Sequence, residues 1–220
     1  NVRLLASTSY LRLAYARPGF PAAPGFDTAE RLALSARSTA FIVSDEPAAS
    51  LAALQHHGAP LYTALEVAHL VDVQRLVRAL GAMAVVGGIA LVAVGWLRRR
   101  AGDRSWVGRA ATSGGWACVA LFALAAAGVG LAWSSFFTGF HETLFRPGTW
   151  QFALDSTLIQ LYPEVFWRDA ATALVGLTVL EGVTLVRLGR RLGPDQEEGD
   201  QRGGGRAGGV GVDGTCRLQP

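Results

Sequence analysis

Four histidines are the side chains of this 220-residue sequence best suited to acid–base chemistry near neutral pH. His56 and His57 are adjacent in the turn-like stretch LQHHGAP. In EVAHLVDVQ, Glu66, His69 and Asp72 recur every three residues, which places them on one face of a helix. We therefore expect Asp72 to accept a hydrogen bond from His69 and raise its basicity. Glu66 is better explained as a helix-capping residue.

The fourth histidine, His141, ends a long uncharged stretch, because no charged residue lies between Arg109 and His141. The segment that follows, FHETLFRPGTWQFALDSTLIQLYPEVFW, is too apolar for an ordinary solvated loop. We expect it to fold back onto a membrane surface as short amphipathic elements. An imidazole held at that depth is suited to chemistry on a lipid.

The composition indicates a membrane protein, since 17% of the residues are charged against about 25% in a typical soluble protein. Three segments, 79–97, 113–137 and 170–186, are apolar enough to cross a bilayer. The first would cover roughly 28 Å as a helix, close to the thickness of the hydrocarbon layer. The predicted fold is an all-α, polytopic membrane helix bundle.

Arginines predict the orientation of these spans, because positive charge is concentrated in cytoplasmic loops. The first loop, RRRAGDRSWVGR, holds five arginines, and we place it in the cytoplasm. Residues 1–75 then form an extracytoplasmic helical region, and residues 76–191 form a transmembrane domain. Within that domain, 138–169 is a re-entrant or surface loop on the outer side. Residues 192–220, rich in glycine and polar residues, are predicted to be a disordered cytoplasmic tail.

An external N-terminal region needs a segment that carries it across the membrane. We therefore expect a further helix or signal before Asn1, and four spans in the intact protein. Two external amphipathic helices are predicted from capping-box spacing, which pairs Asp27 with Glu30 and Thr63 with Glu66. The second of these helices should continue directly into the first span.

Several classes of function are disfavoured by the same residues. The arginines are dispersed and flank apolar spans, so nucleic-acid binding is not expected. No serine-nucleophile elbow is present, and Cys118, inside an apolar run, is interpreted as a small apolar residue. Two alternatives stay open: a non-enzymatic polytopic membrane protein, and a haem protein ligated by His69 and His141. A zinc site built from all four histidines matches no familiar spacing.

Two blocks of the sequence resemble the signature blocks of the bacterial lipoprotein intramolecular transacylase family. They are EVAHLVDVQ and FFTGFHETLFRPGTWQFALDSTLIQLYPEVFW. The stretch FDTAERLALSA also fits the N-terminal region of that family. The positions that match the two blocks are Glu66, His69, Asp72 and Val73, then Phe140, His141, Phe145, Trp150, Asp155, Leu158, Ile159, Pro163 and Phe166.

The resemblance implies four transmembrane helices and an enzyme of the bacterial cytoplasmic membrane. The arginine-based orientation predicts that His69 and His141 both lie on the extracytoplasmic side. The resemblance also implies transfer of the sn-2 acyl chain of a diacylglyceryl-cysteine lipoprotein to the α-amine of the same cysteine. Diacylglyceryl-modified lipoproteins and membrane lipid are the expected partners, with no cofactor or metal; the oligomeric state stays open. His141 and His69 are the expected catalytic residues, supported by Asp72 and Glu66. The expected substrate-binding residues are Phe140, Phe145, Arg146, Trp150 and Asp155.

Overall fold

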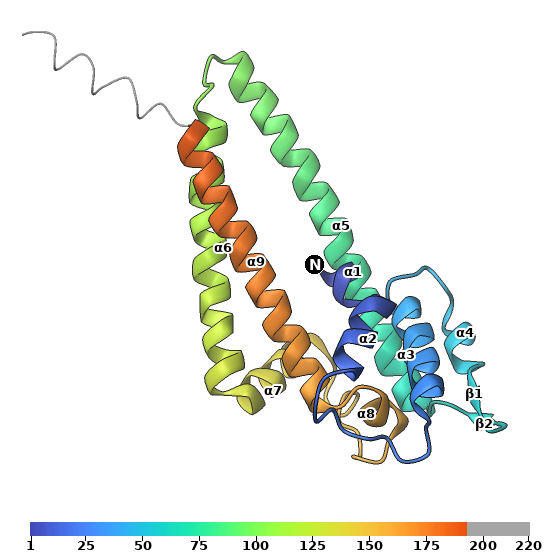
Figure 1. Cartoon of the computed structure of the whole chain (residues 1–220). Coiled ribbons are helices and arrows are strands. Elements are labelled where there is room, and N and C mark those ends of the chain that lie inside the picture. The colour runs from blue at the N-terminus through green and yellow to red at the C-terminus, as the bar shows by residue number, and fades with distance from the viewer. Residues whose placement is uncertain (193–220) are drawn as a thin grey trace, which may run out of the picture.

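The computed structural model describes residues 1–192 and is built almost entirely of α-helices over that range (Figure 1). Three helices are long and apolar enough to cross a membrane: α5 (Ala64–Arg100), α6 (Trp106–Leu131) and α9 (Glu164–Leu192). The predicted all-α membrane fold is confirmed. The predicted disordered tail falls, apart from Leu192, outside the described residues.

Most of the remaining elements form a helical head at one end of the long helices (Figure 1). The opposite end carries the α5–α6 loop and the C-terminal end of α9, so the arginines of both lie together. The sequence predicts that this arginine-rich end faces the cytoplasm. The head consists of α1 (Val2–Leu5), α2 (Thr8–Tyr15), α3 (Thr28–Ile42), α4 (Ala48–Ala52), the hairpin strands β1 (Gln55–His56) and β2 (Ala59–Pro60), and α8 (Thr157–Leu161).

Both predicted capping signals begin helices. The Asp27 side chain accepts from the backbone N–H of Glu30 at the start of α3. Thr63 and Glu66 form a reciprocal capping box at the start of α5, and α5 continues without interruption into the apolar span, as predicted. Each cap satisfies backbone donors that have no partner within the helix.

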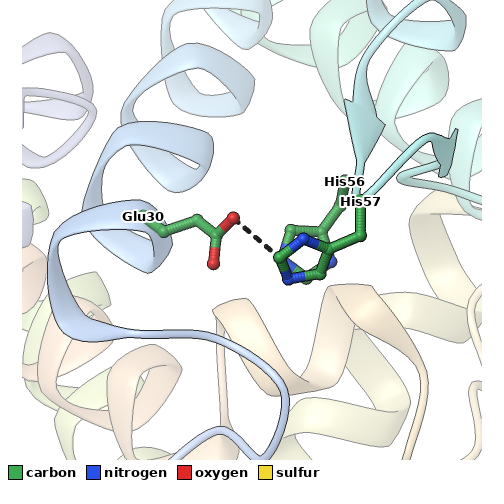
Figure 2. Close-up of side chains that lie close together, drawn as sticks. All are labelled: Glu30, His56 and His57. Atoms are coloured by element: carbon green, nitrogen blue, oxygen red, sulfur yellow. Dashed lines mark ion pairs between the residues drawn. The ribbon is translucent and has the colours of Figure 1, made fainter.

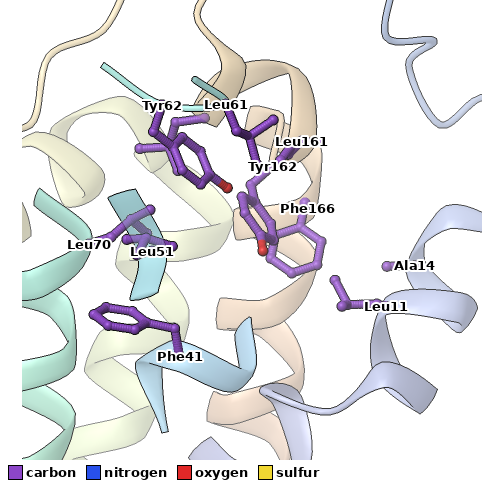
Figure 3. Packing of buried hydrophobic residues seen from close by; sticks show 11 residues of the cluster. Leu11, Ala14, Phe41, Leu51, Leu61, Tyr62, Leu70, Leu161, Tyr162 and Phe166 are labelled. Carbon is purple, nitrogen blue, oxygen red and sulfur yellow. The ribbon is translucent and has the colours of Figure 1, made fainter. Parts of the chain in front are cut away.

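The head has its own hydrophobic core, to which residues far apart in the sequence contribute (Figure 3). Leu11, Phe41, Leu51 and Leu161 are almost completely buried there. Tyr162 places its ring in the same core and donates its hydroxyl to the carbonyl of Ser35 at 2.7 Å. The N-terminal region and residues 158–166 therefore contribute to one shared core.

Packing differs among the three long helices. α6 and α9 lie side by side, and Gly115 meets Gly182 at their contact. A Cβ on Gly115 would lie 2.7 Å from the Gly182 carbonyl oxygen, so glycine permits this close approach. By contrast, most of the apolar side chains of α5 between 79 and 97 are exposed.

The predicted span over 113–137 is wrong at its C-terminal end. α6 ends at Leu131, and Ala132 has a non-helical backbone (φ −144°, ψ 50°). The chain then continues as a separate helix, α7 (Trp133–Leu144). Phe136 of α7 packs over Gly128 of α6, where a Cβ would lie 2.9 Å from the phenyl ring. Because Gly128 has no side chain, the Phe136 ring can pack directly against the α6 backbone.

A buried amide joins α5 to the end of α3. The Nε2 of Gln74 donates toward the carbonyls of Phe41, Ser44 and Glu46 at 3.0, 3.2 and 3.1 Å. Gln74 is only 5% exposed, so its amide group makes its hydrogen bonds inside the protein instead of with water.

We expect Gln74→Leu to destabilise the protein by about 1–3 kcal/mol, because the substitution leaves the part-buried carbonyls of Ser44 and Glu46 without this donor. For a chain of this size the melting temperature should fall by roughly 2–12 °C, measured by thermal unfolding in detergent micelles. Gln55→Leu, at an exposed position, is the matched control. An equal melting temperature for the two variants would contradict the structural role of Gln74.

Candidate functional site

His69 of α5 and His141 of α7 meet where the head joins the long helices. Their ring centroids lie 6.1 Å apart and the ring planes are inclined by 23°. The sequence separates the two by 72 residues, and two different helices carry them. The structure thus brings together the two histidines that the sequence singled out.

His69 lies on the first turns of α5, ahead of the apolar span, and only 8% of it is exposed. Glu66, one turn earlier, holds this end of α5 in place. Glu66 accepts from Thr63 and, at 2.8 Å, from the backbone N–H of Leu158 at the start of α8. Glu66 is therefore the expected capping residue and also joins α5 to α8. The Nδ1 of His69 has no hydrogen-bond partner in the described part of the chain.

His141 is half-buried and is held by its own helix. Its Nδ1 lies 2.8 Å from the carbonyl oxygen of Phe137, four residues earlier. A carbonyl can only accept, so Nδ1 carries the proton in this contact. The neutral ring then has its basic lone pair on Nε2. This hydrogen bond therefore leaves Nε2 as the ring nitrogen of His141 that can accept a proton.

An aromatic cluster surrounds the two imidazoles. Phe145 contacts both rings, at centroid distances of 5.0 Å from His69 and 5.4 Å from His141. Trp150 lies 4.9 Å from His141. Among the described residues, the aromatic rings in contact with the pair are those of Phe137, Phe140, Phe145, Trp150 and Phe152.

Burial in these apolar surroundings disfavours the charged form of both imidazoles. It lowers the pKa of His69 to about 4, with a further lowering by the neighbouring His141 and a partial opposing effect of Asp72. Burial also lowers the pKa of His141, against the opposing effect of the hydrogen bond to Phe137. Both rings are therefore neutral at physiological pH and able to accept a proton.

The depressed pKa values predict a pH dependence of stability. An unfolded histidine titrates near 6.5, whereas folded His69 takes up its proton only near pH 4. Between these values the unfolded chain binds the proton and the folded chain does not, so stability falls as pH falls from about 6.5 to 4. Imidazole ¹⁵N NMR in micelles should show His69 neutral at pH 5.5. A His69 titration midpoint near 6.5 would contradict this prediction.

The hydrogen bond expected between Asp72 and His69 is not formed. Asp72 instead pairs with Arg75 at 3.0 Å, on the same turn of α5. The buried Nδ1 of His69 makes no hydrogen bond with any described residue. Asp72 therefore acts on His69 only through its charge.

The other expected residues lie at different distances from the pair. Phe140, Phe145 and Trp150 belong to the aromatic cluster. Arg146 is exposed. Asp155, also exposed, lines an open pocket of about 680 Å³ together with Glu66 and Phe152. Since Phe152 also contacts His69, this pocket lies beside the histidine pair.

Two members of the aromatic cluster, Phe137 and Phe152, were not among the predicted site residues. The four-residue spacing of Phe137 and His141 was a usable signal, because a helical side chain can reach the carbonyl one turn earlier. Phe152 lies in a segment without regular structure, and its spacing gives no such signal.

Fold and site together define an all-α polytopic membrane protein with a pair of neutral histidines where its head meets the spanning helices. The family model of the lipoprotein intramolecular transacylase Lit matches residues 8–167, which include both histidines. The chain therefore belongs to the lipoprotein intramolecular transacylase family. An uncharacterized protein of Aquifex aeolicus (strain VF5) is 27% identical over 194 residues, covering 86% of this chain and 85% of the relative. No solved structure matches.

Proposed function

We propose that the protein transfers the sn-2 acyl chain of a diacylglyceryl-cysteine lipoprotein to the α-amine of that same cysteine. Membership of the transacylase family supports this reaction. The observation that carries it is the contact between two neutral imidazoles inside an aromatic cluster. The aromatic rings offer an apolar surface for acyl chains, and the imidazoles offer bases beside that surface.

The proposed reaction begins with attack of the neutral amine nitrogen on the sn-2 ester carbonyl. Nε2 of His141 accepts the proton that the nitrogen loses, and a ring N–H of His69 donates to the carbonyl oxygen as negative charge develops there. The bond between the acyl carbon and the sn-2 oxygen then breaks. The imidazolium of His141 returns its proton to that oxygen, giving an N-acylated cysteine and a free sn-2 hydroxyl.

The substrate lowers the difficulty of this reaction in two ways. Its α-amine has a pKa of about 7.7–8.0, so an appreciable fraction is neutral near pH 7. Donor ester and acceptor amine belong to one molecule, so binding in a suitable conformation removes the entropic cost of bringing two reactants together. A site that orients the lipid chains therefore contributes directly to the rate.

In this proposal, exposed Arg146 binds a lipid headgroup at the edge of the site. A guanidinium there is suited to a phosphate of the surrounding lipid headgroups, and it follows directly after Phe145 of the aromatic cluster. Asp155, on the neighbouring open pocket, is proposed to hold the cationic form of the lipoprotein amine before it is deprotonated. We place the site on the extracytoplasmic side, from the arginine distribution.

The reaction is tested by producing the protein in a bacterial host that cannot N-acylate lipoproteins and analysing the N-terminal lipopeptide of one lipoprotein. Substrate and product are isomers of equal mass, so two readouts are needed. Tandem mass spectrometry should show an N-acyl fragment and a monoacylglyceryl group, and an amine-reactive label should no longer modify the peptide. An unblocked amine with an intact diacylglyceryl group, in cells that contain the folded protein, would reject the proposal.

A further inference from the structure

A second cluster of histidines lies in the head. Glu30 of α3 and the two hairpin residues His56 and His57 direct their side chains toward one another (Figure 2). One potential ligand atom from each residue lies within 4.8 Å of the other two. None of these residues belongs to the contacts of the His69–His141 pair, so the cluster is a feature separate from the proposed acyl-transfer site.

The hairpin turn explains how two adjacent residues place their rings together. Successive residues of a strand point to opposite faces, but His57 has a left-handed backbone (φ 51°), as does Gly58 (φ 79°). Two such residues between the paired strands make a two-residue turn of the type that favours Asn-Gly. The result is a centroid distance of 4.1 Å between the rings of His56 and His57.

Other contacts fix the two remaining members. Phe26 stacks on His56, with centroids 4.4 Å apart. Glu30, in the first turn of α3, brings its Oε1 to 3.0 Å from the Nε2 of His56. This Nε2 is buried and makes no hydrogen bond of acceptable geometry with any described residue. His57 is exposed, so the cluster is open to ions from solution.

The donor set matches a transition-metal ion. Two imidazole nitrogens and one carboxylate oxygen are common ligands of Zn²⁺, with a solvent molecule in the fourth position. Tetrahedral ligands about 2.0–2.1 Å from zinc lie roughly 3.4 Å from one another. The Glu30–His56 pair is already at 3.0 Å. A ring nitrogen of the exposed His57 lies within 4.8 Å of both other ligand atoms, so metal binding requires the His57 ring to move closer to them.

Charge is also favourable. The N-terminal end of a helix repels a cation, but the carboxylates of Asp27 and Glu30 both lie at that end of α3. We propose that Glu30, His56 and His57 bind one divalent transition-metal ion such as Zn²⁺. The ion joins the β1–β2 hairpin to α3 and stabilises the head.

The proposal is tested on the full chain, purified without a histidine tag, by titration with Zn²⁺ in a calorimeter. One ion should bind per chain. His57→Asn is the decisive variant, because Asn keeps the preference for the left-handed turn but removes an imidazole. We expect it to lower zinc affinity by at least about tenfold, and Glu30→Gln to act in the same direction.

Thermal unfolding gives a second readout that separates binding from folding. Saturating Zn²⁺ should raise the melting temperature of the original chain, because the ion binds the folded state, but not that of His57→Asn. Without zinc the two should melt alike. A double variant, His69→Ala with His141→Ala, serves as the control and should keep its affinity for zinc. Affinity that survives in His57→Asn, or that disappears with the double variant, would overturn the proposal.

Discussion

Replacing His141 by alanine is expected to lower the rate of acyl transfer by about 10²–10⁴-fold, the usual contribution of a positioned acid–base group. The hydrogen bond to Phe137 holds the ring in the tautomer with its lone pair on Nε2, and burial keeps the ring neutral. Alanine provides neither the base nor its orientation. The rate is measured on a synthetic diacylglyceryl-cysteine lipopeptide in micelles, from the appearance of the N-acyl fragment.

Two variants make this prediction specific. Thr143→Ala changes an exposed residue of the same helix, whose hydroxyl only donates to the Gly139 carbonyl, and should keep the original rate. His69→Ala should also be strongly impaired. If the two histidines act in one step, the double variant should be little slower than either single one. Normal turnover by folded His141→Ala protein would remove His141 from the mechanism.

The second large effect is expected on stability, from Glu66→Ala. Glu66 is 1% exposed and accepts from the backbone of Thr63, the hydroxyl of Thr63 and the backbone of Leu158. Hydrogen bonds to a charged acceptor are worth about 1.5–3 kcal/mol each. We expect a loss of at least about 3 kcal/mol, because the substitution leaves two backbone donors without their acceptor.

For a protein of this length that loss lowers the melting temperature by roughly 6–12 °C, measurable in micelles by intrinsic fluorescence. Glu142→Ala is the appropriate comparison, since Glu142 is exposed at the end of α7 and should melt as the original chain does. A similar stability of Glu66→Ala and Glu142→Ala would show that Glu66 does not join α5 to α8 as described.

Helix starts and apolar spans were predictable because their causes are local. The side chains of Asp27 and Thr63 satisfy backbone donors a few residues away, so spacing alone reveals them. The end of α6 was not predictable in this way. Alanine is the best helix former, yet the helix breaks at Ala132, where α7 packs back on α6. That contact depends on tertiary structure.

In the candidate site, too, the features with local causes were predictable and those that depend on tertiary contacts were not. Residue type and position identified His69 and His141, but their contact depends on how the head packs against α5 and α7. The partner of Asp72 was misjudged because two candidates, His69 and Arg75, both lie three residues away. The structure selects Arg75. Phe152 was missed because its approach to His69 requires a fold of the chain across 83 residues.

α5 runs without interruption from the head into the apolar span. The same helix carries His69 and the apolar segment that begins ten residues later. His141 lies on a different helix, α7, which follows the break at Ala132. A tilt of α5 relative to α7, of the kind by which helices match the thickness of a bilayer, moves one imidazole relative to the other. The 6.1 Å spacing of the two rings therefore depends on the angle between α5 and α7.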